Sequence, residues 1–106
     1  MTDSFRRYEI LLPQQFNDGR PVPDELLGAT LVELRQRFGA ISCETQSIQG
    51  VWEHAGTVYD DRLTRLFIDV VDTEENHRFF KSYKEELKKR FQQLDIWMTS
   101  YPVDVV

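Results

Sequence analysis

Two stripes of large apolar residues at helical spacing constrain the fold of this chain more than any other feature of its sequence. The first lies in a helix predicted over residues 23–38, which Gly39 ends as a left-handed C-terminal residue. The second lies in a helix predicted over residues 73–94, with Asp72 and Glu75 in a capping box. The stripes consist of Leu27, Leu31, Leu34 and Phe38, and of Phe80, Tyr83, Leu87, Phe91 and Leu94.

Four other segments alternate between apolar and polar residues with the period of two that is typical of strands. They are predicted over residues 7–12, 40–53, 57–71 and 95–101. Pro13 ends the first strand and Pro102 the last, because proline donates no hydrogen bond to a sheet. The second strand changes phase, which predicts a bulge between Gln46 and Gly50. Residues 54–56 are predicted to turn the chain into the third strand as a hairpin.

The order strand–helix–strand–strand–helix–strand indicates the fold. Two right-handed βαβ units joined by a hairpin predict an α+β domain of the ferredoxin-like βαββαβ type. In this plait a four-stranded antiparallel sheet carries both helices on one face. The chain has 106 residues, the usual size of one domain, and we expect residues 1–106 to form a single domain.

The N-terminal residues, the hydropathy and the single cysteine favour a cytoplasmic location. Residues 1–7 are polar and do not resemble a secretory signal, and no stretch approaches the roughly 20 apolar residues of a membrane span. The single cysteine, Cys43, cannot form an internal disulfide and is expected to be a buried, inert thiol. We therefore expect a cytoplasmic protein without a membrane partner.

Charge argues against nucleic acid as a partner. The net charge is −5, which repels a phosphate backbone. The basic residues of the second predicted helix are interspersed with Glu85 and Glu86, as on a solvated helix face. Residues 64–70 also lack the aromatic pattern of the RNA-recognition motif, which shares this topology.

The sheet face away from the helices is predicted to be apolar, because each strand carries apolar residues on both of its faces. The residues expected there are Leu11, Phe67, Val71, Trp97 and Tyr101. Exposed patches of this kind mark interfaces or ligand grooves. We expect this one to pair two copies sheet to sheet as a homodimer. The alternative is that strand ends or the tail over residues 102–106 cover part of it.

Residues 50–61 are the most unusual stretch of the sequence. The candidate catalytic residues there are Glu53, His54, Asp60 and Asp61, and the candidate ligand-binding residues are Trp52 and Tyr59. Two carboxylates and an imidazole can perform acid–base chemistry or hold a divalent ion. The structural alternative is a solvated hairpin, since turns favour polar residues anyway.

Sequence motifs leave the activity open. The chain has no metal-ligand spacing, glycine-rich phosphate loop or serine nucleophile elbow, so we predict neither a metal site nor a cofactor. The leading hypothesis is a non-catalytic association or regulatory module that dimerises through its sheet. The alternative is a small cofactor-independent enzyme of the dimeric α+β barrel type. Its pocket would lie near the hairpin over residues 50–61 and take a small molecule.

Overall fold

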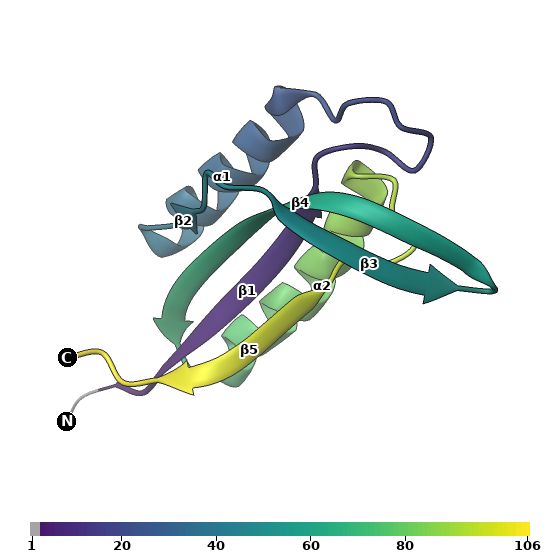
Figure 1. Ribbon diagram of the computed structural model, residues 1–106. Helices are drawn as coiled ribbons and strands as arrows, with labels where there is room; N and C mark the ends of the chain where they lie inside the picture. Colours follow the sequence, from purple (N-terminus) through teal and green to yellow (C-terminus); the bar gives the residue numbers. More distant parts are fainter. Residues whose placement is uncertain (1–2) are drawn as a thin grey trace.

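The computed structural model describes residues 3–106 and has an α+β, ferredoxin-like fold (Figure 1). Both helices lie on one face of an antiparallel sheet, in which β1 is central and pairs with β4 on one side and β5 on the other. The elements are β1 Phe5–Pro13, α1 Asp24–Phe38, β2 Ser42–Cys43, β3 Ile48–His54, β4 Thr57–Val71, α2 Glu74–Arg90 and β5 Met98–Val103. The predicted plait is therefore confirmed.

The sheet has five strands rather than the predicted four, because the second strand is interrupted. Its two parts, β2 and β3, both pair with β4. From Cys43 to Ile48 the chain advances five residues, whereas their partners Leu66 and Leu63 on β4 are three residues apart. Two extra residues are thus accommodated in the break. The predicted change of phase is real, but it divides the strand instead of forming a bulge within it.

The second helix is shorter than predicted and begins differently. Its N-cap is Thr73, whose hydroxyl accepts a hydrogen bond from the backbone N–H of Asn76, so the predicted Asp72–Glu75 capping box is wrong. The helix ends at Arg90, and Gln92 has a φ of 54°. This left-handed residue turns the chain toward β5. The first helix ends as predicted, with Gly39 at a φ of 90°.

The last strand runs from Met98 to Val103, whereas the sequence predicted residues 95–101. Pro102 lies within the strand and does not end it. Within the described chain β5 pairs with β1 and has its other edge unpaired, and proline is tolerated on such an edge strand.

The core lies between the sheet and the two helices. Tyr8, Ile10 and Leu12 of β1 alternate toward the helices. From β4 come Leu66 and Ile68, which pair with Ile10 and Tyr8, and Val70. The helices supply Leu34, Phe80, Tyr83, Leu87 and Phe91. The predicted stripe of α2 is thus buried, except that Leu94 lies beyond the helix and is 50% exposed. In the part of the chain described, no helix is long and apolar enough to cross a membrane.

A polar network connects the two helices at one end of this core. The Arg90 guanidinium donates to the buried Thr30 hydroxyl at 2.8 Å and to the Glu33 carboxylate at 2.7 Å. The Tyr83 hydroxyl also donates to Glu33, at 2.7 Å. Hydrogen bonding from Arg90 and then from Tyr83 lowers the pKa of the Glu33 carboxyl, although partial burial opposes this. The network satisfies the buried Thr30 hydroxyl and fixes α2 relative to α1.

The sheet face away from the helices carries charged residues among its apolar ones. The register places Leu11, Phe67, Val71, Trp97 and Tyr101 on this open face, as predicted from their parity. Arg7 and Asp69 form a bidentate ion pair at 2.7 and 3.0 Å across β1 and β4. The Arg65 guanidinium on β4 donates to the Glu9 carboxylate on β1, which is diagonal to it in the register. The surface is therefore a mixed aromatic and ionic layer, where the sequence had predicted an apolar patch.

Phe67 lies at the centre of the open face between two guanidinium groups. The Arg7 carbon Cζ is 4.9 Å from the centroid of its ring and that of Arg65 is 4.5 Å away, both within cation–π range. Hydrogen bonds from Arg65 and Tyr101 lower the pKa of the Glu9 carboxyl. These contacts hold the side chains of the open face in a defined arrangement.

Cys43 is exposed on β2, so its predicted burial is wrong. The strand is two residues long and lies at the sheet edge, which leaves the side chain exposed. Partial desolvation and the neighbouring Glu44 carboxylate raise the pKa of the Cys43 thiol. A raised pKa leaves less of the thiol as the nucleophilic thiolate, which is compatible with the expectation that Cys43 is unreactive.

Candidate functional site

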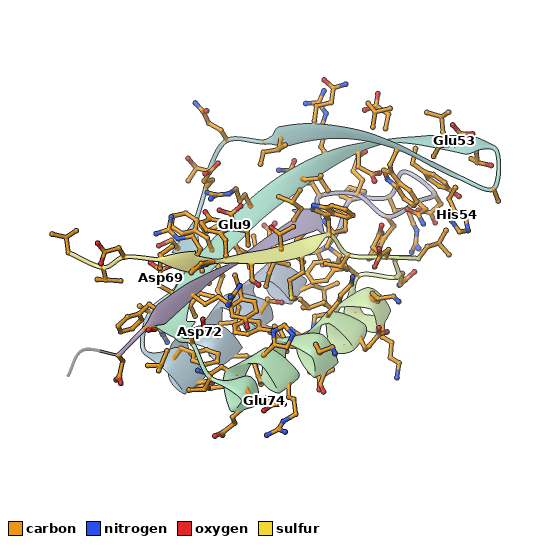
Figure 2. The ribbon with its side chains drawn as sticks, turned by 90° about the horizontal axis from the view of Figure 1, so that it is seen from below. Glu9, Glu53, His54, Asp69, Asp72 and Glu74 are labelled. Atoms are coloured by element: carbon orange, nitrogen blue, oxygen red, sulfur yellow. The ribbon has the colours of Figure 1, made fainter. Side chains whose placement is uncertain are left out.

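The hairpin of β3 and β4 extends beyond the rest of the sheet (Figure 1). The first half of β4 pairs with β3, and the second half pairs with β1, so the long strand continues from the sheet into the projecting arm. Figure 2 shows Glu53 and His54 at the end of this arm, far from Glu9 and Asp69 on the open face. Ala55 and Gly56 form the turn with positive φ values of 51° and 82°.

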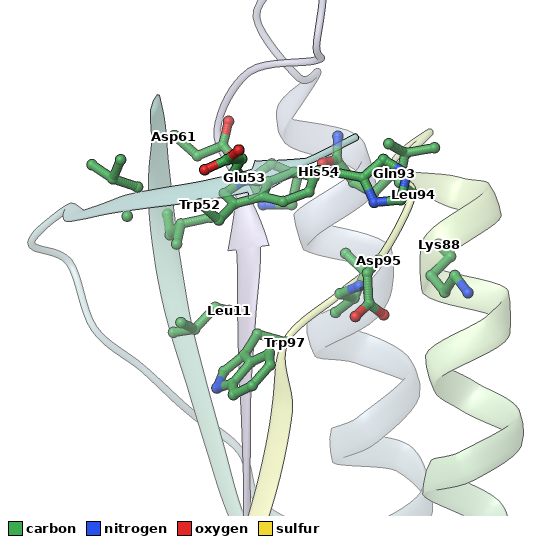
Figure 3. Close-up of a pocket in the computed structure, with 15 residues that line it drawn as sticks. Leu11, Trp52, Glu53, His54, Asp61, Lys88, Gln93, Leu94, Asp95 and Trp97 are labelled. Carbon is green, nitrogen blue, oxygen red and sulfur yellow. Dashed lines mark hydrogen bonds between the residues drawn. The ribbon is translucent and has the colours of Figure 1, made fainter. Parts of the chain in front are cut away.

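A groove of about 730 Å³ lies between the hairpin and the connection from α2 to β5 (Figure 3). Trp52, Glu53, His54 and Asp61 line it from the hairpin. Lys88, Leu94, Asp95 and Trp97 line it from the opposite side, and Leu11 and Leu63 of the sheet lie between. We call this space the hairpin groove.

The hairpin wall of the groove is built around Trp52. Its ring stacks on that of Tyr59, the directly opposite residue on β4, with centroids 4.3 Å apart and an interplanar angle of 15°. The indole Nε1–H donates to Asp61 Oδ2 at 2.6 Å. A stacked neighbour and a charge-assisted hydrogen bond therefore fix the orientation of the Trp52 side chain.

Gly50 allows the hairpin to lie close to the sheet at the base of the groove. A Cβ atom at this position would be 2.9 Å from the Leu63 Cδ1 atom, closer than carbon atoms pack. The absence of a side chain at residue 50 therefore leaves room for Leu63. The sequence singled out this glycine because of the nearby change of phase, and the structure gives its steric reason.

The opposite wall comes from the segment between α2 and β5. After the left-handed Gln92, the chain places Leu94, Asp95 and Trp97 at the groove. The Asp95 carboxylate accepts from the backbone N–H of Ile96 at 2.9 Å and pairs with the Lys84 ammonium at 3.1 Å. The Trp97 side chain is 65% exposed. This wall thus presents an uncovered indole beside a carboxylate that is held in place.

The structure brings together most of the predicted site residues. Glu53, His54, Asp61 and Trp52 line the groove, and Tyr59 supports Trp52. Asp60 lies on the other face of the hairpin, as alternation along a strand requires, and Glu53 shares that face by register. Gln49 Nε2 donates to Asp60 at 3.2 Å. Within residues 3–106, no group of three or more His, Cys, Asp or Glu side chains is arranged to hold a metal ion.

Carboxylates outnumber cations in the groove. Asp61 and Asp95 carry negative charge, whereas Lys88 is the one lysine among the described lining residues. The two tryptophans add large faces with negative quadrupole potential. A groove with this lining favours a ligand that combines a flat ring with positive charge.

Comparison with known proteins identifies structures with the same fold. No protein-family model matches the sequence, and no curated protein sequence matches it. The structure resembles a phage SAM lyase solved in complex with S-methyl-5'-thioadenosine, with a TM-score of 0.69 and 14% identity over 99% of this chain and 92% of that one. It also resembles CutA1 from Oryza sativa, with a TM-score of 0.62 and 14% identity over 99% and 84% of the two chains. For CutA from Synechococcus elongatus PCC7942 the TM-score is 0.61 and the identity 7%, over 96% and 79%. Identities this low establish a shared fold alone.

Proposed function

We propose that this chain binds a small organic cation with a planar ring in the hairpin groove. One observation carries the proposal: two tryptophans and the carboxylates of Asp61 and Asp95, from the two walls, line the same groove. Its volume of about 730 Å³ lies within the range of roughly 300–1,000 Å³ that is common for ligand pockets. Trp52 is already oriented by Tyr59 and Asp61, so a ligand would meet a preorganised surface.

An adenosylsulfonium compound such as S-adenosylmethionine has the required chemistry. Its adenine ring would stack on an indole, and its sulfonium centre would lie near the carboxylates of the groove. The similar phage SAM lyase supports this choice of ligand, because it adopts the same fold and was solved with S-methyl-5'-thioadenosine. If the bound sulfonium compound is also cleaved, the chain is a small enzyme that needs no further cofactor.

Replacing Trp52 by leucine is expected to weaken S-adenosylmethionine binding by about 10-fold or more, because a stacked ring contributes roughly 1–3 kcal/mol. Isothermal titration calorimetry measures the change. Tyr101→Leu is the matched control, since it removes an exposed aromatic ring that does not line the groove. Equal binding by the two variants would place the ligand elsewhere, and no binding by the native chain up to about 1 mM would refute the proposal.

A second substitution separates charge from shape. In Asp61→Asn the amide oxygen can still accept the Trp52 hydrogen bond, so only the negative charge is removed. We expect this variant to weaken binding of the cationic S-adenosylmethionine more than binding of the neutral S-methyl-5'-thioadenosine. Mass spectrometry of the same mixture reports cleavage, because the thioadenosine would accumulate. If the sulfonium compound remained uncleaved, we would conclude that the groove binds it without catalysis.

A second candidate function is self-association, favoured by the uncovered aromatic residues of the open face. Trp97 and Tyr101 are 65% and 41% exposed, and the ion pairs around Phe67 hold the face rigid. A homodimer that pairs two open faces would bury these rings, and its ion pairs are already satisfied within each copy. The chain would then act as an association or regulatory module, with or without a ligand in the groove.

Native mass spectrometry tests this candidate, with a dimer of twice the chain mass as the expected result. Tyr101→Arg should convert the dimer to monomer, because it places a cation where apolar surface would be buried. The new guanidinium would have Glu9 beside it, so the monomer should remain folded. Val58→Arg is the control, since Val58 is exposed on the hairpin, on the strand face opposite to that of Phe67, and does not line the groove. A native chain that is monomeric at micromolar concentration would exclude the open face as a stable interface.

A further inference from the structure

Within residues 3–106, the outer edge of β5 has backbone groups without a strand partner. The Leu11 N–H donates to the Trp97 carbonyl at 3.0 Å, which fixes the phase of the ladder between β1 and β5. Because antiparallel pairs alternate, odd-numbered residues of β5 bond to β1 and even-numbered ones direct their N–H and C=O groups outward. Met98 and Ser100 therefore present free donors and acceptors, and Pro102 lies at the next outward position, where no N–H is needed.

A cleft of about 360 Å³ runs between this edge and α2. Its apolar floor consists of Tyr8, Phe80 and Met98. Along the side formed by α2 stand Lys81, Lys84 and Lys88, which follow one another at helical spacings of three and four residues. Figure 1 shows α2 behind β5 and alongside it. We call this feature the β5 cleft.

The lysines of the β5 cleft are only partly neutralised. Lys84 pairs with Asp95 at 3.1 Å and Lys88 with Glu85 at 3.3 Å. Lys81 is exposed on the same side. Glu85 and Asp95 also line the cleft, so its three lysines exceed its two carboxylates by one, in a chain whose net charge is −5. The cleft thus combines a strand edge that can form hydrogen bonds, an apolar floor and lysine side chains. A ligand that fits it needs an extended backbone, apolar side chains and negative charge.

We propose that the β5 cleft binds an extended acidic peptide segment of a partner protein as an additional strand of the sheet. The backbone of the segment pairs with Met98 and Ser100, and alternate side chains point toward the floor and away from it. Acidic side chains at some of the floor-facing positions lie next to Lys81 and Lys84, because α2 covers that side of the sheet. A second copy of the same edge fits poorly, because two-fold pairing of β5 with itself would bring two lysine rows together.

Fluorescence anisotropy with a labelled octapeptide, Val-Thr-Glu-Thr repeated twice, tests the proposal on the full chain, because valine and glutamate then share the strand face that meets the cleft. We expect saturable binding that weakens as salt rises, and no binding of the matching peptide with lysine in place of glutamate. The double variant Lys81→Glu with Lys84→Glu should lose about 10-fold in affinity. Lys89→Glu, an exposed residue of α2 outside the cleft, should bind as the native chain does.

Amide hydrogen exchange locates the bound peptide independently of the charge variants. Binding at the edge should protect the amides of Met98 and Ser100, while a peptide that merely follows charge would leave them unprotected. The proposal is overturned by a lack of binding up to about 1 mM, or by equal binding to the native and double-variant chains. It is also overturned if these two amides become protected without peptide as a dimer forms, since the occupant is then a second copy.

Discussion

Replacing Leu87 with alanine is expected to lower the free energy of unfolding by about 2–5 kcal/mol, the range for a buried leucine in a packed core. Its side chain is fully buried where α2 faces the sheet, so the truncation leaves a cavity that neighbouring residues can fill only in part. Leu34→Ala should cost about the same, because Leu34 is equally buried on α1. Urea denaturation followed by circular dichroism measures both changes.

Leu94→Ala is the matched control for Leu87→Ala. The two leucines belong to one helical stripe in the sequence, yet Leu94 is 50% exposed beyond the end of α2. Its truncation should therefore cost no more than about 1 kcal/mol. If both variants lost the same stability, the helix would have to continue past Arg90, as the sequence predicted, and the turn at Gln92 would be wrong.

The fold could be predicted because local periodicity and topology rules agree. The alternation in β1 and the stripe of α2 are strong signals over many residues, and handedness restricts how the units combine. The end of α2 was mispredicted for the same reason, since Leu94 happens to continue the helical spacing after the helix has ended. Pro102 was wrongly predicted to end the last strand, because the order of strands in the sheet, and so which strand is at an edge, cannot be told from local sequence.

The candidate site was predicted only on its hairpin side. Trp52, Asp61 and their neighbours were found because they are close in sequence and chemically unusual. Asp95 and Trp97 on the opposite wall are more than thirty residues away, and they reach the groove through the turn at Gln92. No local pattern indicates that the hairpin projects toward this turn. A site made from two distant segments depends on tertiary geometry, which periodicity does not supply.

The open face shows a further limit of reading apolar residues by parity. Phe67 was placed on the correct side of the sheet, but its neighbours Arg7 and Arg65 lie on the same side and cover its ring. The odd or even position of a residue along its strand tells which face of the sheet it lies on. How exposed its side chain is depends on its neighbours across the strands. Interaction surfaces inferred from apolar residues alone therefore overstate the apolar area.

Phe80→Ala is expected to lower the free energy of unfolding by about 3–5 kcal/mol, because the Phe80 ring connects three elements of the core. It stacks on Tyr8 of β1 at a centroid distance of 3.9 Å and on Phe38 of α1 at 5.4 Å. Its side chain is 1% exposed. Chemical denaturation would record the loss as a lower transition midpoint with an unchanged slope.

Phe80→Leu distinguishes the contribution of the ring from that of apolar volume. Leucine fills most of the same space, so this variant should lose only about 1–2 kcal/mol. A double-mutant cycle with Phe38→Leu should then give a coupling of about 0.5–1.5 kcal/mol for the stacked pair. If the leucine variant lost as much as the alanine variant, ring stacking rather than burial would dominate at this position. If neither variant were destabilised, α2 could not pack on β1 through Phe80, and the placement of the helix against the sheet would be wrong.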